Sequence, residues 1–166
     1  FEEVGMVFLY APAFHPAMRF VAPVRKKLAR RTLFNFLGPL SSPGKVKRQL
    51  LGVGVSETLP AYAKVLTGLG VHSAYVVHGA GGADEITPAG VNQVVAVGNA
   101  PKTCFDAETL GLESAPVSAL EGGDKNQNLK LLQELFDGEV NPIRTAVLQN
   151  TAAALLLAGI AGDAGE

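Results

Sequence analysis

A strand, a helix and a second strand follow one another in the first half of the chain, and this order constrains the fold more than any other feature. Residues 50–55 are rich in β-forming residues, residues 58–69 suit a helix that Gly70 would end, and residues 73–77 are apolar. Two strands joined by a helix lie parallel in one sheet with a right-handed crossover. Ligands bind beyond the carboxyl ends of such strands. The pattern therefore predicts an α/β fold and the edge where a site should lie.

Elements on both sides of this unit extend the expected sheet. Residues 6–10 read as a short apolar strand, and residues 16–28 read as a helix with proline at its first position. Residues 91–97 and 102–105 flank a Gly-Asn turn signal, which indicates a hairpin. A hairpin beside parallel strands makes the sheet mixed.

Two helices are expected near the C-terminus. Asp124 caps a helix over residues 126–136, and an Asn-Pro step opens another over residues 143–160. The second helix is apolar on nearly every face, so we expect it to be buried against the sheet or another part of the protein. The expected architecture is a single α/β domain over residues 1–166, with a mixed, mainly parallel central sheet flanked by helices.

Charge and cysteine content exclude several classes of protein. The formal net charge is -1, so no bulk electrostatic attraction to nucleic acid or to an anionic membrane is expected. The longest apolar stretch, residues 151–161, is too short to span a bilayer. Cys104 is the single cysteine, which excludes an internal disulfide and favours a cytoplasmic location. The chain opens without an initiator methionine, so we expect it to be a piece of a longer protein.

The run HGAGGADEIT brings two adjacent carboxylates, Asp84 and Glu85, directly after the strand expected at residues 73–77. Two carboxylates on a glycine-rich loop at the end of a strand form an oxygen-rich site that suits Mg²⁺ together with substrate phosphates. An Asp-Glu pair in a loop is also common as solvated surface. The loop alone does not decide between these readings.

Four segments together resemble the anthranilate phosphoribosyltransferase family of tryptophan biosynthesis. They are HPAMRFVAPVRKKL, RRTLFNFLGPLSSP, KRQLLGV and VVHGAGGADE, in this order and at these spacings. The resemblance implies a large α/β domain with a mixed sheet, a small N-terminal helical domain that is largely absent here, and an active site between them. It also implies that this chain is most of the C-terminal large domain of a longer, homodimeric enzyme.

The resemblance implies an anthranilate site in the first part of the chain. Arg25 would face the anthranilate carboxylate, which a planar guanidinium can bind with two parallel hydrogen bonds. Gly38 and Pro39 would line the anthranilate tunnel, and His15 falls in the substrate-side segment. The alternatives are a solvated basic helix face for Arg25, an ordinary loop breaker for Gly38-Pro39, and a cap or packing role for His15.

In the same resemblance, Asp84 and Glu85 bind Mg²⁺ near the pyrophosphate of phosphoribosyl pyrophosphate. His72 and His78 are read as structural. The implied reaction joins anthranilate to the phosphoribosyl group and releases pyrophosphate, and no residue of this chain is assigned as a catalytic base.

Three rival readings stay open. One is a pyrimidine nucleoside phosphorylase-like enzyme of the same fold. Another is a catalytically degenerate relative that binds nucleic acid through a basic cluster, formed by Lys26, Lys27, Arg30 and Arg31. A third is that the isolated chain is only a stable folding unit without activity.

Overall fold

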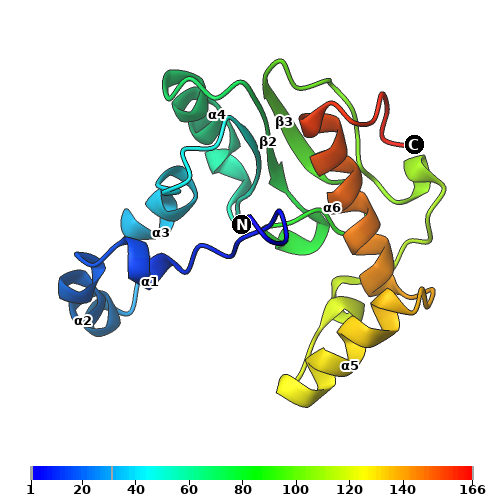
Figure 1. The fold of residues 1–166 in the computed structure, drawn as a ribbon, viewed down its shortest axis with the longest axis horizontal. Coiled ribbons are helices and arrows are strands. Elements are labelled where there is room, and N and C mark those ends of the chain that lie inside the picture. Colours follow the sequence, from blue (N-terminus) through cyan, green and yellow to red (C-terminus); the bar gives the residue numbers. More distant parts are fainter. Residues whose placement is uncertain (1, 31, 166) are drawn as a thin grey trace. The chain divides into compact units, whose positions relative to one another are not determined.

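The computed structural model describes residues 2–30 and 32–165, which form two compact units, Phe1–Lys45 and Val46–Glu166. Each unit has its own architecture (Figure 1). Among the described residues, the regular elements of the first unit are all helical, and the second unit contains the whole of the sheet. No helix in this described part of the chain is both long and apolar enough to cross a membrane.

The first unit is built from three short helices and one 3-10 turn. They are α1 (Ala11–Phe14), α2 (Met18–Leu28), α3 (Phe34–Leu37) and η1 (Gly38–Leu40). Helix α2 ends at Ala29, which has a left-handed φ of 46° and donates its N–H to the Arg25 carbonyl oxygen. The helix predicted for residues 16–28 is therefore confirmed from Met18 onward.

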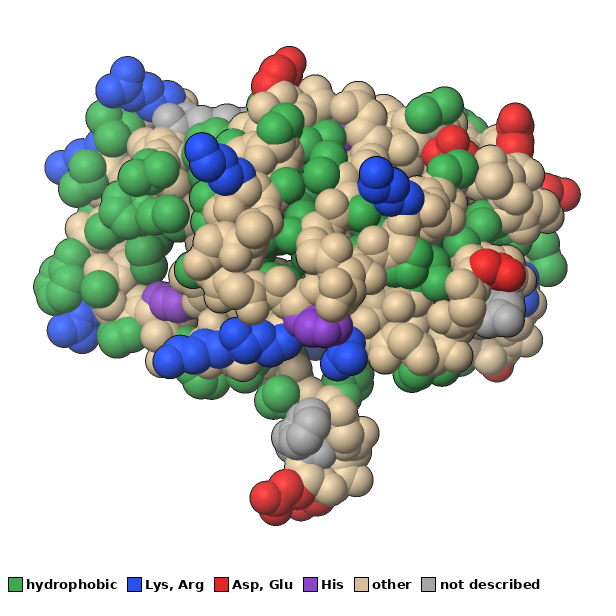
Figure 2. Space-filling model, turned by 90° about the horizontal axis from the view of Figure 1, so that it is seen from above, with side chains coloured by type: hydrophobic (Ala, Val, Ile, Leu, Met, Phe, Trp, Pro, Cys, Tyr) green, Lys and Arg blue, Asp and Glu red, His purple; other side chains and the backbone are tan. Residues whose placement is uncertain are grey.

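The strand predicted for residues 6–10 is wrong. These residues have no regular secondary structure, and Met6 and Phe8 are 76% and 86% exposed. A strand is stable only beside a neighbour that binds its N–H and C=O groups, and no described segment pairs with this one. None of the residues described in the first unit is buried. Apolar side chains also lie exposed across the face drawn in Figure 2.

The second unit is built on a three-stranded sheet in the order β1-β2-β3. Strand β1 (Arg48–Gly52) lies parallel to β2 (Ser73–His78), and β2 lies antiparallel to β3 (Gln93–Gly98). The crossover from β1 to β2 runs through η2 (Ser56–Thr58) and α4 (Leu59–Gly68). The predicted βαβ unit and the mixed character of the sheet are confirmed. The described strands form one parallel and one antiparallel pair.

Residues 102–105 do not form the predicted second strand of a hairpin. Strand β3 pairs back onto β2, and the chain then turns into the core. Phe105 is completely buried, and its carbonyl oxygen accepts a hydrogen bond from Gln149 Nε2 at 2.6 Å. In a strand, the Phe105 carbonyl oxygen would accept from the backbone of a neighbouring strand. Here the Gln149 side chain takes that place, in agreement with the irregular backbone of these residues.

Two longer helices and three 3-10 turns complete the second unit. They are η3 (Ala80–Gly82), η4 (Glu108–Leu110), η5 (Val117–Leu120), α5 (Lys125–Phe136) and α6 (Pro142–Ala158). Both helices begin at side-chain caps, as predicted. Asp124 accepts from two N–H groups in the first turn of α5, each at 2.9 Å, and Asn141 accepts from the Arg144 N–H at 2.9 Å. Helix α6 ends at Gly159, which has a left-handed φ of 73°.

The core of the second unit lies between the sheet and α6, and α4 also contacts the sheet (Figure 1). At its centre the rings of Tyr75 and Phe105 meet edge to face, with centroids 5.1 Å apart. Ile86 and Leu156 belong to the same cluster. Because Ile86 directly follows Glu85, the core packing also places the end of the loop that carries the two carboxylates.

Candidate functional site

A tight turn after β2 leads into Asp84 and Glu85. The Gly79 N–H donates to the Ala83 carbonyl oxygen at 2.9 Å, which closes the turn. Within it Gly81 has a φ of 78°, in the left-handed region that favours glycine. The glycine-rich run therefore forms a compact turn, and the two carboxylates follow at its exit.

Two glycines at strand ends let this loop lie directly against the sheet. A Cβ on Gly52, the last residue of β1, would collide with the Asp84 carbonyl oxygen. A Cβ on Gly79, the first residue after β2, would collide with the Glu85 carbonyl oxygen. Each acidic residue is thus in backbone contact with the end of a strand. The pair lies at the carboxyl ends of β1 and β2, the edge that the βαβ pattern predicts.

Side-chain amides hold the two residues that come next. Asn150 of α6 accepts from the Ile86 N–H at 3.2 Å and donates to the Ile86 carbonyl oxygen at 2.8 Å. Asn92 accepts from the Thr87 N–H and donates to the Thr87 carbonyl oxygen, both at 3.0 Å. Neither amide was predicted to serve the site. For Asn150, the available signal was the amide pair Gln149-Asn150 in the middle of a mostly apolar helix.

The carboxylates of Asp84 and Glu85 are exposed and can meet a solvated ligand. Within residues 2–30 and 32–165, no group of three or more His, Cys, Asp or Glu side chains could hold a metal. The donors that this loop offers are therefore two carboxylates. Mg²⁺ in phosphate-binding sites typically takes one or two protein carboxylates and completes its octahedron with water and phosphate oxygens. The donor set fits Mg²⁺ and does not fit a metal that needs a full protein cage.

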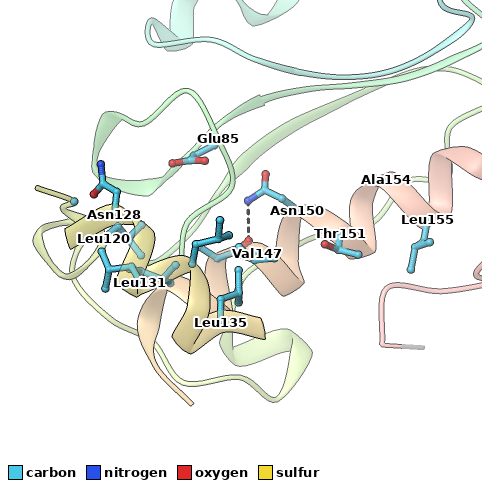
Figure 3. A pocket seen from close by; sticks show the side chains of 14 residues that line it. Glu85, Leu120, Asn128, Leu131, Leu135, Val147, Asn150, Thr151, Ala154 and Leu155 are labelled. Carbon is cyan, nitrogen blue, oxygen red and sulfur yellow. Dashed lines mark hydrogen bonds between the residues drawn. The ribbon is translucent and has the colours of Figure 1, made fainter. Parts of the chain in front are cut away.

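A hollow of about 620 Å³ lies between α5 and α6, and Glu85 and Asn150 are among the residues that line it (Figure 3). The α5 side contributes leucines, including Leu131 and Leu135. The Asn150 amide also donates to the Ala146 carbonyl oxygen at 2.8 Å, one turn earlier in α6. The hollow is thus largely apolar, with the Glu85 carboxylate at its edge.

The two histidines of the second unit are tied to neighbouring groups. His78 places Nδ1 2.7 Å from the Val53 carbonyl oxygen, and since a carbonyl only accepts, Nδ1 carries the proton. The Nδ1 atom of His72 lies 3.2 Å from Ser73 Oγ, and its Nε2 atom lies 3.0 Å from the side-chain nitrogen of Asn99. These bonds agree with a structural reading of both.

Arg25 lies on α2 in the first unit, where it lines a hollow of about 520 Å³. Lys26, Arg30 and Asn35 share this lining. Arg25 forms no ion pair with any residue that the structure describes. Its guanidinium is therefore available to an anion, and the neighbouring cations add to the attraction. Arg31, the remaining member of the predicted basic cluster, lies outside the described residues.

The other residues of the predicted anthranilate site also lie in the first unit. Gly38 and Pro39 begin η1, and apart from the adjacent residues and the backbone of its own helix, no described atom lies within 4 Å of the position that a Cβ on Gly38 would take. His15 follows α1, donates its N–H to the Ala11 carbonyl oxygen at 3.0 Å and accepts from the Met18 N–H at 2.9 Å. The backbone of His15 thus links α1 to α2, and the space beside Gly38 is open to another group.

A sequence profile described as "Glycosyl transferase family, a/b domain" matches residues 1–166, the whole chain. The chain belongs to this glycosyl transferase family. Among curated members it is 45% identical over 167 residues to an anthranilate phosphoribosyltransferase of Parvibaculum lavamentivorans, covering 99% of this chain and 49% of the relative. A second, from Rhodopseudomonas palustris, has the same identity and coverage. The resemblance seen in the sequence is confirmed, and the chain spans about half the length of these relatives.

Solved members of the glycosyl transferase family share the fold. Anthranilate phosphoribosyltransferase from Thermus thermophilus matches with a TM-score of 0.90 and 42% identity, over 99% of this chain and 49% of that one. The enzyme from Saccharomyces cerevisiae in complex with PRPP and Mg matches with a TM-score of 0.80 and 30% identity, over 91% and 44% of the two chains. The same yeast enzyme in complex with 4-fluoroanthranilate matches with a TM-score of 0.82 and 32% identity, over 93% and 46%.

Proposed function

We propose that this chain works as part of an enzyme that transfers the phosphoribosyl group of phosphoribosyl pyrophosphate to anthranilate. The products are N-(5-phosphoribosyl)anthranilate and pyrophosphate. The observation that carries the proposal is the exposed Asp84-Glu85 pair, seated on the ends of β1 and β2 in a chain 45% identical to curated anthranilate phosphoribosyltransferases. We assign the activity to a protein of the relatives' length and expect the 166-residue chain alone to be inactive.

Asp84 and Glu85 are the proposed ligands of Mg²⁺. When bound, Mg²⁺ stabilises the negative charge that gathers on departing pyrophosphate. The two carboxylates would place the metal ion relative to the sheet. Their backbone lies against the strand ends because Gly52 and Gly79 have no Cβ that would collide with it. The yeast relative solved in complex with PRPP and Mg supports this assignment.

Arg25 is the proposed ligand of the anthranilate carboxylate, with Gly38, Pro39 and His15 in the same binding region. Two parallel hydrogen bonds from the guanidinium orient a flat carboxylate, and with it the ring and the amino group. The hollow beside Arg25 and the open space beside Gly38 support this role. The yeast relative in complex with 4-fluoroanthranilate supports it further.

In the proposed reaction the amino nitrogen bonds to C1 of the ribose while the bond from C1 to the pyrophosphate oxygen breaks. The electron pair of the broken bond leaves with pyrophosphate, and the nitrogen then loses one proton. Catalysis would come mainly from alignment of the amine and stabilisation of the leaving group. We assign no catalytic base to this chain. A pyrimidine nucleoside phosphorylase-like relative would need no clamp for an aromatic carboxylate, so Arg25 separates the two readings.

Four further properties belong to the same proposal. We expect a homodimer, a cytoplasmic location, and a mainly parallel sheet once further strands join the described three. We also expect residues 1–166 to work as one α/β domain, most of the large domain of the enzyme. The match of the family's a/b domain to the whole chain supports the last of these.

The function is tested by following the loss of anthranilate fluorescence with phosphoribosyl pyrophosphate and Mg²⁺. The samples are a protein of the relatives' length that carries this chain, its Arg25→Ala variant and the 166-residue chain. We expect turnover by the longer protein and none by the chain alone. Arg25→Ala should raise the KM for anthranilate about tenfold or more, because a charged hydrogen-bonding partner is lost.

Lys27→Ala is the matched control, because Lys27 is exposed on the same helix and does not line the hollow beside Arg25. It should leave the KM for anthranilate within about twofold, since an exposed charge contributes little. Equal increases of the KM for anthranilate in the two variants would show that α2 acts by its general positive charge, and they would reject a specific bond from Arg25 to the carboxylate. Absence of anthranilate consumption by the longer protein would reject the proposed function, and phosphorolysis and nucleic-acid binding would then be the readings to test.

A further inference from the structure

The backbone immediately after Glu85 is held by side chains instead of by a helix or a strand. The N–H and C=O groups of Ile86 both bond to Asn150, and those of Thr87 both bond to Asn92. Four consecutive backbone polar groups are thus paired with amides. Ile86 and Thr87 are completely buried, so water cannot replace these bonds. The backbone groups of these two residues are therefore all hydrogen-bonded, as they would be in a central strand.

The amides come from parts of the chain that are distant in sequence from the site. Asn150 lies in α6, 64 residues beyond Ile86. Its neighbour Gln149 donates to the carbonyl oxygens of Thr87 at 3.3 Å and Phe105 at 2.6 Å. Helix α6 therefore holds this segment through two successive amide side chains.

The bond between Asn150 and the Ile86 N–H acts on Glu85 directly. That N–H belongs to the peptide group that joins Glu85 to Ile86, so Asn150 sets the plane of this peptide. On its other side, the Glu85 carbonyl oxygen faces the position of a Cβ on Gly79. The backbone of Glu85 is thus held between α6 and the end of β2. The point at which its side chain leaves the backbone is therefore restricted on the Ile86 side.

We infer that Asn150 is a positioning residue for the Asp84-Glu85 carboxylate pair. In this role it acts through its two hydrogen bonds to the backbone of Ile86. The inference rests on the proposed metal-binding role of the pair. Loss of Asn150 frees the Glu85–Ile86 peptide to rotate, so the two carboxylates no longer present a fixed pair of oxygens. Partners that orient metal ligands typically change metal affinity tenfold or more when they are removed.

Mn²⁺, used alone as a probe for the Mg²⁺ site, provides the test. Its affinity for a protein of the relatives' length that carries this chain is measured by electron paramagnetic resonance of the free ion. The samples are the wild type, Asn150→Ala and the double variant Asp84→Asn, Glu85→Gln. Amide hydrogen exchange at Ile86 is followed in parallel. We expect Asn150→Ala to raise the dissociation constant of Mn²⁺ about tenfold and to speed exchange at Ile86 by a similar factor or more.

Asn128→Ala is the matched control. Asn128 lines the same hollow as Asn150 and also binds both backbone groups of one residue, accepting from the Gly123 N–H at 2.8 Å and donating to its carbonyl oxygen at 3.2 Å. It does not touch the loop after Glu85, so Mn²⁺ affinity should stay within about twofold of the wild type. If Asn150→Ala fails to fold, Asn150→Ser replaces it, because its shorter hydroxyl can still donate to the Ala146 carbonyl oxygen while both bonds to Ile86 are lost.

The outcomes separate this inference from the proposed function. If the wild type binds Mn²⁺ no better than the double carboxylate variant, the metal site itself is rejected, and the inference with it. If the wild type binds through the carboxylates but Asn150→Ala binds equally well despite faster exchange at Ile86, only the positioning role is rejected. Equal losses in Asn150→Ala and Asn128→Ala would also reject it, because they would reflect a general loosening.

Discussion

The carbonyl oxygen of Asp84 lies where a Cβ on Gly52 would stand. Gly52 is the last residue of β1 and pairs with Val77 of β2, so the acidic loop rests directly on the end of the parallel strand pair. A side chain of any size at this position would displace the Asp84 backbone. The glycine therefore permits the position of the acidic loop, although it contributes no functional group.

Gly52→Ala should destabilise the protein by about 1–3 kcal/mol, because the new methyl group meets backbone that must shift. The measurement is the free energy of unfolding from urea titration. Gly54→Ala is the control, since Gly54 has open space at its Cβ position and no left-handed φ, and its effect should stay within about 0.5 kcal/mol. Equal losses in the two variants would show that the close approach of Asp84 is unimportant.

Phe105→Ala should cost about 3–5 kcal/mol of unfolding free energy. Phe105 is completely buried and meets the Tyr75 ring edge to face, so truncation leaves a cavity at the centre of the core. Phe136→Ala removes the same atoms from a ring that is 81% exposed, and should cost less than about 0.5 kcal/mol. Urea unfolding measures both variants. A loss below about 1 kcal/mol for Phe105→Ala would contradict its place in the core.

Alkaline pH should destabilise the protein through Tyr75. Burial raises the pKa of the Tyr75 hydroxyl in the folded protein. The unfolded chain keeps the ordinary tyrosine pKa of about 10 and so loses its proton first as pH rises. The stability that the neutral Tyr75 hydroxyl contributes to the folded state is fully present below the unfolded pKa. It is lost as the pH rises from the unfolded pKa through the higher folded pKa.

Tyr75→Phe tests this pH dependence by urea unfolding between about pH 7 and pH 11. At neutral pH the variant should lose about 1 kcal/mol, because the hydroxyl no longer donates to the Pro101 carbonyl oxygen, a bond of 2.7 Å in the wild type. Its further loss above pH 10 should be smaller than in the wild type. Some alkaline loss should persist, since burial also raises the pKa of Tyr62. Identical alkaline slopes would contradict the assignment to Tyr75.

The sequence by itself determined the features that depend on neighbouring residues. The caps at Asp124 and Asn141 form where their side chains reach N–H groups of the next turn. The βαβ unit follows from the order of its apolar segments, and the parallel direction of its strands predicted the edge at which Asp84 and Glu85 lie. These features need only local hydrogen bonds and the periodicity of apolar side chains.

Only the tertiary structure decided the features that depend on a distant partner. Residues 6–10 have the composition of a strand, yet they form none, because no described segment pairs with them. Residues 102–105 give up strand geometry because Phe105 packs into the core and its carbonyl oxygen is taken by Gln149. The hydrogen bonds between the Asn150 side chain and the Ile86 backbone join positions 64 residues apart. Hydrogen bonds and packing across such separations depend on how the elements fold together, which local sequence patterns do not encode.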